Sequence, residues 1–125
     1  MNLLTFEELE VWQKSRILTK MVFDKCEVTS KKFPYSLTDQ ILRASISVMS
    51  NIAEGFGAGS DKNFIKYLNI SIGSLNEVKS LLYVFVDQKY FTEQEFNEIY
   101  KLAKEINKML FGLKKYLTTE TQRHD

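Results

Sequence analysis

The stretches ASISVMSNIA (Ala44–Ala53) and YLNISIGSLN (Tyr67–Asn76) contain no charged residue, although 26% of the whole chain is charged. Between them lies FGAGS (Phe56–Ser60), whose glycines and serine are typical of a turn. If the chain folds back at this turn, the two uncharged stretches lie side by side. A surface helix normally shows one polar face to water. The hairpin therefore predicts that a second copy of the protein covers this surface, through Ile46, Ser47, Ser50, Asn51, Tyr67, Ile70 and Ser74.

Charged residues of opposite sign flank the two uncharged stretches. The hairpin places Arg43 near Glu77 at one end and Glu54 near Lys66 at the other. Glu54 and Glu77 on facing helices could form an acid–base pair, but each has a basic neighbour, and buried polar groups are retained when they are paired. We therefore interpret these four residues, with Asn51, as structural polar anchors within or between subunits.

The chain is helical in pattern nearly throughout. Its single proline and five glycines leave long runs uninterrupted, and no run alternates with period two. We expect four helices: one over about 6–29, one that begins near Leu37, one that begins after Ser60, and one that begins at Thr92. Short connections favour antiparallel neighbours. The sequence therefore predicts an all-α, up-down-up-down four-helix bundle, a single domain over 1–118 with a flexible tail over 119–125.

The expected helix ends carry capping signals. Ser36 and Ser60 are expected N-caps, and Thr92 with Glu95 has the spacing of a capping box. Gly55 is expected to end the second helix in a left-handed conformation. Apolar residues at spacings of three and four predict the core-facing stripes, which are Val11, Leu18, Val22 and Cys26; Ile41, Ser45, Val48 and Ile52; Phe64, Leu68, Ser71, Leu75, Val78, Leu82 and Phe85; and Phe96, Ile99, Ala103, Ile106, Leu110, Leu113 and Leu117.

Composition excludes several classes of protein. No run of 18 or more apolar residues is present, so no membrane span is expected. The acidic N-terminus does not resemble a secretory signal. A lone cysteine, Cys26, cannot form an internal disulfide, which fits a reducing cytoplasm. We therefore expect a cytoplasmic protein that is not attached to a membrane.

Residues that carry common enzyme chemistry are missing. The single histidine, His124, lies in the expected tail, and no histidines or cysteines have metal-ligand spacing. GFGAG (Gly55–Gly59) follows a helix rather than a strand and lacks the Lys-Ser/Thr ending of a phosphate-binding loop. The sequence therefore indicates a protein that is not an enzyme, with no catalytic, cofactor or metal site and no small-molecule substrate.

Lysines provide a second, weaker functional signal. The net charge of +1 argues against a strong general affinity for nucleic acid, and glutamates interleave with the lysines of the fourth helix. The densest basic spot is near the first connection, and without an aromatic stacking platform it is weak evidence for RNA binding. The candidate nucleic-acid contacts are Lys25, Lys31, Lys32, Lys101, Lys104 and Lys108.

Four segments carry a family resemblance: FEELEVWQKS (6–15), QILRA (40–44), SNIAEGFG (50–57) and FIKYLNISIGSLNEV (64–78). Together they resemble the bacterial 23S rRNA intervening-sequence proteins, some of which are encoded within inserts in large-subunit rRNA genes. The resemblance implies a four-helix bundle that forms a ring-like homopentamer without catalytic activity. The family is similar in fold to retroelement accessory variability proteins, which form pentamers and bind nucleic acid and a reverse transcriptase.

This chain departs from the family pattern in ways that bear on function. Met49 occupies a position where a proline is frequent, so the second helix should be straighter. Ala58 replaces a commonly basic residue, which removes charge from the hairpin tip and weakens the case for RNA binding. The leading hypothesis is a non-enzymatic homo-oligomeric, pentameric scaffold or adaptor whose partner is itself. The alternative is an RNA-binding or ribosome-associated protein with weak, nonspecific and salt-dependent binding, whose partners are RNA, another nucleic acid or a nucleic-acid enzyme.

Overall fold

The computed structural model describes residues 1–29 and 34–124. These residues contain helices and no strand, which confirms the all-α class. The elements are a short 3-10 helix, η1 (Phe6–Glu8), followed by α1 (Glu10–Thr29), α2 (Tyr35–Phe56), α3 (Asp61–Asp87) and α4 (Glu93–His124).

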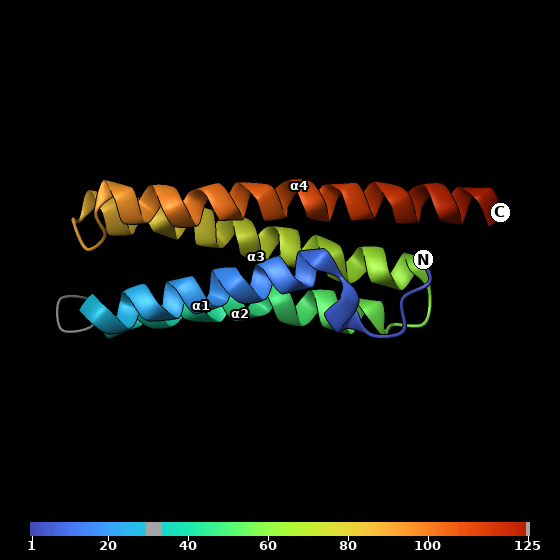
Figure 1. Cartoon of the computed structure of the whole chain (residues 1–125), viewed down its shortest axis with the longest axis horizontal. Coiled ribbons are helices and arrows are strands. Elements are labelled where there is room, and N and C mark those ends of the chain that lie inside the picture. Colours follow the sequence, from blue (N-terminus) through green and yellow to red (C-terminus); the bar gives the residue numbers. More distant parts are fainter. Residues whose placement is uncertain (30–33, 125) are drawn as a thin grey trace.

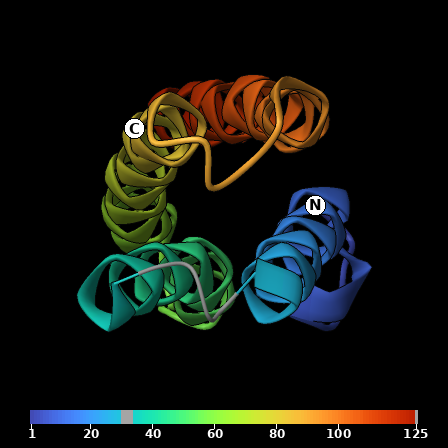
Figure 2. The ribbon, with the colours of Figure 1, turned by 90° about the vertical axis from the view of Figure 1, so that its left-hand side faces the viewer.

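The four α-helices run alternately in opposite directions along one long axis (Figure 1). Viewed from the end, they surround a common centre in chain order (Figure 2). The most extensive contact joins α2 and α3, followed by α3 with α4, while α1 packs against α2 and α4. The structure therefore confirms the predicted up-down-up-down bundle.

The predicted apolar stripes form the core of this bundle. Leu18, Ile41, Leu68, Leu82 and Ile106 are fully buried, and so are most other members of the four stripes. Phe96 and Leu113 are half-buried at the edge of the core. The period of about 3.6 residues was sufficient to find these positions because each helix buries one stripe.

Small hydroxyl side chains join the first three helices. The buried Ser71 hydroxyl donates to the Val48 carbonyl across the α2–α3 contact at 2.9 Å. The Thr19 hydroxyl on α1 lies 3.2 Å from the Ser45 carbonyl on α2. Serine is small enough for two backbones to approach closely, and each hydroxyl has an acceptor. Part of the uncharged sequence is therefore explained by packing within one protomer.

The predicted N-caps of α3 and α4 are confirmed. The Ser60 hydroxyl accepts a hydrogen bond from the Asn63 amide at 3.1 Å. Thr92 and Glu95 exchange bonds, since the Glu95 amide donates to the Thr92 hydroxyl at 3.1 Å and the Thr92 amide donates to Glu95 Oε1 at 2.9 Å. These side chains satisfy backbone donors that have no partner within the helix.

The predicted start of α2 was wrong. The helix begins at Tyr35, and Pro34 occupies the N-cap position without a side-chain cap bond. Ser36 therefore lies within the first turn. Proline is well suited to a helix start because its φ is fixed near the helical value and no amide hydrogen is left unpaired. The Pro34 carbonyl accepts from the amides of Leu37 and Thr38.

The first and last helices also differ from the predicted bounds. Leu9 has an extended backbone, with φ −73° and ψ 121°, and this separates η1 from α1. Its side chain is buried, and the rings of Phe6 and Trp12 meet edge to face at 5.0 Å. At the other end, α4 continues to His124 through the segment that we expected to be a tail.

Gly55 does not end α2 in a left-handed conformation, as the sequence had suggested. It lies inside the helix, and the cap is Gly57 with φ −91°. A Cβ at Gly55 would lie 2.8 Å from Phe64 Cδ1 and 2.9 Å from Tyr67 Cβ on α3. Glycine is therefore required here for the close approach of α3. In the turn, Gly59 adopts the positive φ of 88°.

Candidate functional site

The seven predicted contact residues share the outer surface of α2 and α3, which we call the hairpin face. Ile46 is 43% exposed and Ile70 is 44% exposed, and both lie in the stretches of sequence that contain no charged residue. Ser50 is exposed as well, and Ser47, Asn51, Tyr67 and Ser74 are half-buried. In one protomer, therefore, this face is open to solvent.

Polar groups at the centre of the hairpin face bond to one another. The hydroxyls of Ser47 and Ser74 lie 2.7 Å apart. The Asn51 amide nitrogen donates to the Ser47 carbonyl at 2.9 Å and lies 3.1 Å from the Ser47 hydroxyl. One hydroxyl hydrogen and the Asn51 amide group therefore already have acceptors within the protomer, which reduces the cost of covering the centre of this face.

A shallow hollow of about 580 Å³ lies beside Ile46. Its lining includes Leu42 and Ser50 from α2, and it also includes Phe23 from α1. Phe23 is 41% exposed and extends the apolar part of the hairpin face. The sequence analysis missed Phe23. The available signal was a large apolar residue next to Val22, outside the core stripe of α1.

The flanking charges are arranged differently from the prediction. Arg43 pairs with Asp39 one turn earlier in α2, with Nε and Oδ2 2.8 Å apart, rather than with Glu77. Glu54 and Lys66 line one shallow hollow of about 460 Å³, yet they form no ion pair within the described part of the chain. All four predicted charged anchors are exposed. The expected pairs within one hairpin are therefore wrong, because the long side chains extend into solvent.

Three of the candidate nucleic-acid contacts share one surface of α4. Lys101, Lys104 and Lys108 line a hollow of about 540 Å³. Glu105 also lines it, but this carboxylate lies 3.3 Å from Lys14 Nζ on α1. The acidic group in the lining is therefore paired with a lysine from outside, and the surface keeps its positive charge.

The other three candidate lysines differ from those on α4. Lys25 on α1 lies 3.7 Å from Glu95 Oε2 on α4, so its charge is partly neutralised within the protomer. Lys31 and Lys32 lie outside the described residues. Among the candidate lysines that the structure describes, those on α4 are therefore the ones that form no ion pair.

Aromatic rings lie next to this basic surface. Tyr83 on α3 is 49% exposed and contacts Phe96 and Tyr100 on α4, with ring centroids 4.9 and 5.5 Å apart. The Nζ atom of Lys79 lies 5.6 Å from the centre of the Tyr100 ring. Sequence reasoning missed this cluster because its members come from two helices, and because Tyr83 and Tyr100 lie outside the core stripes.

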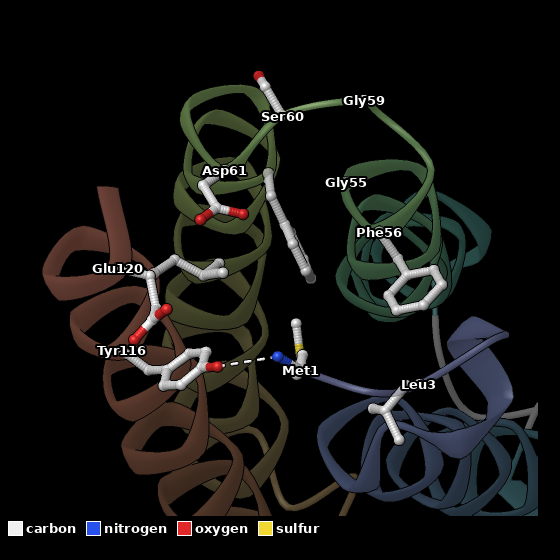
Figure 3. A pocket seen from close by; sticks show the side chains of 11 residues that line it. Met1, Leu3, Gly55, Phe56, Gly59, Ser60, Asp61, Tyr116 and Glu120 are labelled. Carbon is white, nitrogen blue, oxygen red and sulfur yellow. Dashed lines mark hydrogen bonds between the residues drawn. The ribbon is translucent and has the colours of Figure 1, made fainter. Parts of the chain in front are cut away.

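A further hollow, of about 280 Å³, lies at one end of the bundle (Figure 3). The N-terminal segment, the turn between α2 and α3, and the last part of α4 meet there. The Met1 amino group donates to the Tyr116 hydroxyl at 3.0 Å, and the carboxylates of Asp61 and Glu120 belong to the same wall. The Met1–Tyr116 hydrogen bond joins the N-terminal segment to α4.

Metal-ligating side chains do not cluster in residues 1–29 and 34–124. There, no set of three His, Cys, Asp or Glu side chains is placed to hold a metal ion. Cys26 is 2% exposed, and burial raises the pKa of its thiol to about 11. In the same residues, no helix combines the length and apolar character needed to cross a membrane.

Comparison with known proteins agrees with this architecture. Residues 7–112 match the family described as 23S rRNA-intervening sequence protein. The chain belongs to this family. The match begins within η1, spans α1, α2 and α3, and ends at Gly112 within α4, so the intervening-sequence protein family covers most of the bundle. It also confirms the resemblance noted in the four sequence segments.

A solved member of a related group has the same fold. The crystal structure of a protein with unknown function from the S23 ribosomal protein family of Bacteroides thetaiotaomicron VPI-5482 is similar, with a TM-score of 0.77 and 30% identity. The similarity covers 84% of this intervening-sequence family member and 98% of the other chain. Comparison with curated proteins gave no match.

Proposed function

We propose that this protein is a non-enzymatic four-helix bundle that binds further copies of itself through the hairpin face and acts as a scaffold or adaptor. The observation that carries this proposal is the exposure of Ile46 and Ile70 in two adjacent stretches without charges, which are flanked by charges of opposite sign. Fully burying an isoleucine is worth about 1.5–3 kcal/mol. Covering these half-exposed side chains, with Phe23 beside them, would therefore contribute roughly 1 kcal/mol each.

The flanking charges support a second copy as the occupant. Because α2 and α3 are antiparallel and are joined at Ser47 and Ser74, Arg43 is level with Glu77, and Glu54 is level with Lys66. In a ring whose axis is parallel to the helices, α2 of one copy meets α3 of the next at the same level. Each rim charge would then face an opposite charge of its neighbour, which favours this partner and register.

Five copies is the number that we propose for this ring, in accordance with the resemblance described above. A ring forms when a head-to-tail contact closes on itself. In this arrangement, the α2 edge of each copy binds the α3 edge of the next, so every copy uses both edges.

Light scattering tests the proposal directly. The unmodified protein should have the mass of about five copies at micromolar concentration, and Ile46→Asp should reduce this mass to that of one copy, because a carboxylate would be buried without a partner. Ile17→Asp is the matched control, since Ile17 is 50% exposed on α1 and outside the hairpin face. A monomeric unmodified protein would contradict the proposal.

A charge exchange tests the arrangement of the copies. Arg43→Glu should weaken the assembly, and adding Glu77→Arg in the same chain should restore it, because the two positions would then face each other with reversed signs. A dimer that pairs Arg43 with Glu54 of its neighbour would respond differently. There, Glu54→Arg would restore the assembly and Glu77→Arg would not.

Weak nucleic-acid binding is a second candidate function. It is favoured by the hollow on α4, where Lys101, Lys104 and Lys108 come together while Glu105 is paired with Lys14. A ring would repeat this surface around its axis, and repetition strengthens weak contacts. The structure offers lysines, which hold phosphates without reading sequence.

Salt dependence tests this second candidate. Binding of a structured RNA in a mobility-shift assay should weaken steeply between about 50 and 200 mM salt. Changing Lys101 and Lys104 to glutamate should abolish the shift and leave the mass unchanged. The separate pair Lys31→Glu and Lys32→Glu reports on the first connection. Tight, sequence-specific binding that persists at high salt would overturn a weak and nonspecific mode.

A further inference from the structure

The aromatic cluster between α3 and α4 presents an exposed ring on a rigid support. Tyr83 is 49% exposed, and its ring is inclined at 56° to Phe96 and at 71° to Tyr100. The rings of Phe96 and Tyr100 stack with an angle of 21° and centroids 5.1 Å apart. Two packed rings therefore hold Tyr83 in place, so a planar ligand could bind it at a small entropic cost.

Positive charge surrounds this ring from both helices. A hydrogen bond with Tyr100 raises the pKa of the Tyr83 hydroxyl, while the positive charges of Lys79 and Lys104 act to lower it. The Nζ atom of Lys79 lies 5.6 Å from the centre of the neighbouring Tyr100 ring, and Lys104 lines the same hollow as Tyr100. Among the residues that the structure describes, Lys79, Lys101, Lys104 and Lys108 form no ion pairs. Their charges are available to a ligand.

The carboxylate that lines this hollow pairs with a lysine from another helix. Glu105 belongs to the same hollow as Tyr100 and Lys104, but it pairs with Lys14 on α1 at 3.3 Å. An anionic ligand on this surface would thus meet lysines and an aromatic ring, with the repulsion of Glu105 reduced by its partner.

We infer that this flank of α3 and α4 binds single-stranded nucleic acid, with a base stacked on Tyr83 and the neighbouring phosphates held by Lys79, Lys101 and Lys104. The inference rests on the second candidate function and specifies its ligand. Stacking on an aromatic ring requires an unpaired base, because the faces of bases in a duplex are already covered by their neighbours. An acidic protein segment would use the lysines but would gain little from the ring.

This surface remains accessible when the hairpin face is covered. Ile70 and Tyr83 are 13 positions apart on α3, which places them about 140° apart around the helix at 3.6 residues per turn. Self-association through Ile70 and Ser74 would therefore leave Tyr83 open. Each copy in a ring would carry one such surface.

Fluorescence anisotropy provides the test. The probes are a labelled oligouridine of about ten nucleotides, an abasic ribose-phosphate strand of the same length, and a duplex RNA of the same length. At about 50 mM salt, the oligouridine should bind roughly tenfold more tightly than the abasic strand, which is the gain expected from one stacked base. It should also bind more tightly than the duplex.

Variants at Tyr83 assign the effect to this ring. Tyr83→Leu should weaken oligouridine binding roughly tenfold and leave the abasic strand unaffected, whereas Tyr83→Phe should bind like the unmodified protein. Tyr35→Leu is the matched control, because Tyr35 is 83% exposed on α2, away from α4. Light scattering and circular dichroism confirm that each variant keeps its mass and its helices.

The possible failures are distinguishable. Equal binding of all three probes, unchanged in Tyr83→Leu, would overturn the stacking inference and leave nonspecific phosphate binding standing. No binding of any probe would overturn both. Loss of oligouridine binding in Tyr35→Leu alone would place the site at the first connection and overturn the inference. Binding of polyglutamate with an affinity similar to that of oligouridine, unchanged in Tyr83→Leu, would indicate an acidic protein partner and overturn the inference.

Discussion

The hydroxyl oxygens of Ser47 and Ser74 lie 2.7 Å apart across the contact between α2 and α3. The two residues are 27 positions apart in the chain, and their bond marks the level at which the two antiparallel helices meet. It also occupies the centre of the hairpin face, with Ile46 and Ile70 exposed nearby. One small polar pair therefore links the packing of the protomer to the surface proposed for assembly.

Removing either hydroxyl should destabilise the protein modestly. Ser47→Ala and Ser74→Ala should each lower the free energy of unfolding by about 1 kcal/mol, and the double variant by less than their sum, because the same bond is lost. Ser47→Ala should have the larger effect, since Asn51 also lies within hydrogen-bond distance of that hydroxyl. Urea unfolding at one protein concentration measures these free energies. The control is Ser80→Ala, because Ser80 is an exposed serine on α3. Fully additive effects would contradict the coupling.

Two helical glycines should respond to alanine in opposite directions. Gly55→Ala would place a Cβ 2.8 Å from Phe64 and 2.9 Å from Tyr67, so it should destabilise the fold by about 1–3 kcal/mol. Gly112→Ala meets no atom within 4 Å and should stabilise α4 by up to about 1 kcal/mol. Thermal melting of both variants checks this. A neutral Gly55→Ala would show that α3 can move away from α2.

Arg43 should contribute little to the stability of an isolated protomer. Its side chain is 79% exposed and, among the described residues, its ion pair is with Asp39 in the same helix; such exposed pairs are worth about 0.5 kcal/mol or less. In the Ile46→Asp background, Arg43→Ala should therefore barely change the melting temperature. In the unmodified assembly, the same substitution should lower the melting temperature and the mass if Arg43 faces Glu77 of a neighbour. An equal, small effect in both backgrounds would show that Arg43 has no role between subunits.

Cys26 should be unreactive in the folded protein. It is 2% exposed, and burial raises the pKa of the thiol to about 11, so almost no thiolate is present near about pH 8. An aromatic disulfide reagent should modify it only after the protein unfolds in denaturant. Rapid labelling of the native protein would indicate that α1 opens frequently.

Ionisation of the Cys26 thiol should also make the stability of the protein depend on pH. The folded pKa lies above that of the unfolded chain, near about 8.5, so the folded state holds the proton more tightly. The stabilisation is complete below that value and is lost as the pH rises toward the folded pKa of about 11. The difference in unfolding free energy between the unmodified protein and Cys26→Ala should therefore shrink across this range. A constant difference would contradict the shift.

The sequence by itself determined the helices and the core. Apolar periodicity identified buried residues such as Leu18 and Leu75, and the caps at Ser60 and Thr92 were recognisable. These features depend on the spacing of residues within one helix, or on bonds between residues three apart. They are therefore readable without knowing how the helices are arranged.

Only the tertiary structure decided which surfaces those helices present. Phe23 adjoins Ile46 because α1 packs against α2, and Tyr83 adjoins Tyr100 and Lys79 because α3 packs against α4. Gly55 was expected to cap α2, but it is a contact point for α3. In each case the deciding distance joins residues on different helices, and it depends on how the helices pack. Spacing along one chain segment specifies a helix and its buried stripe, but contacts between helices decide what its remaining surface does.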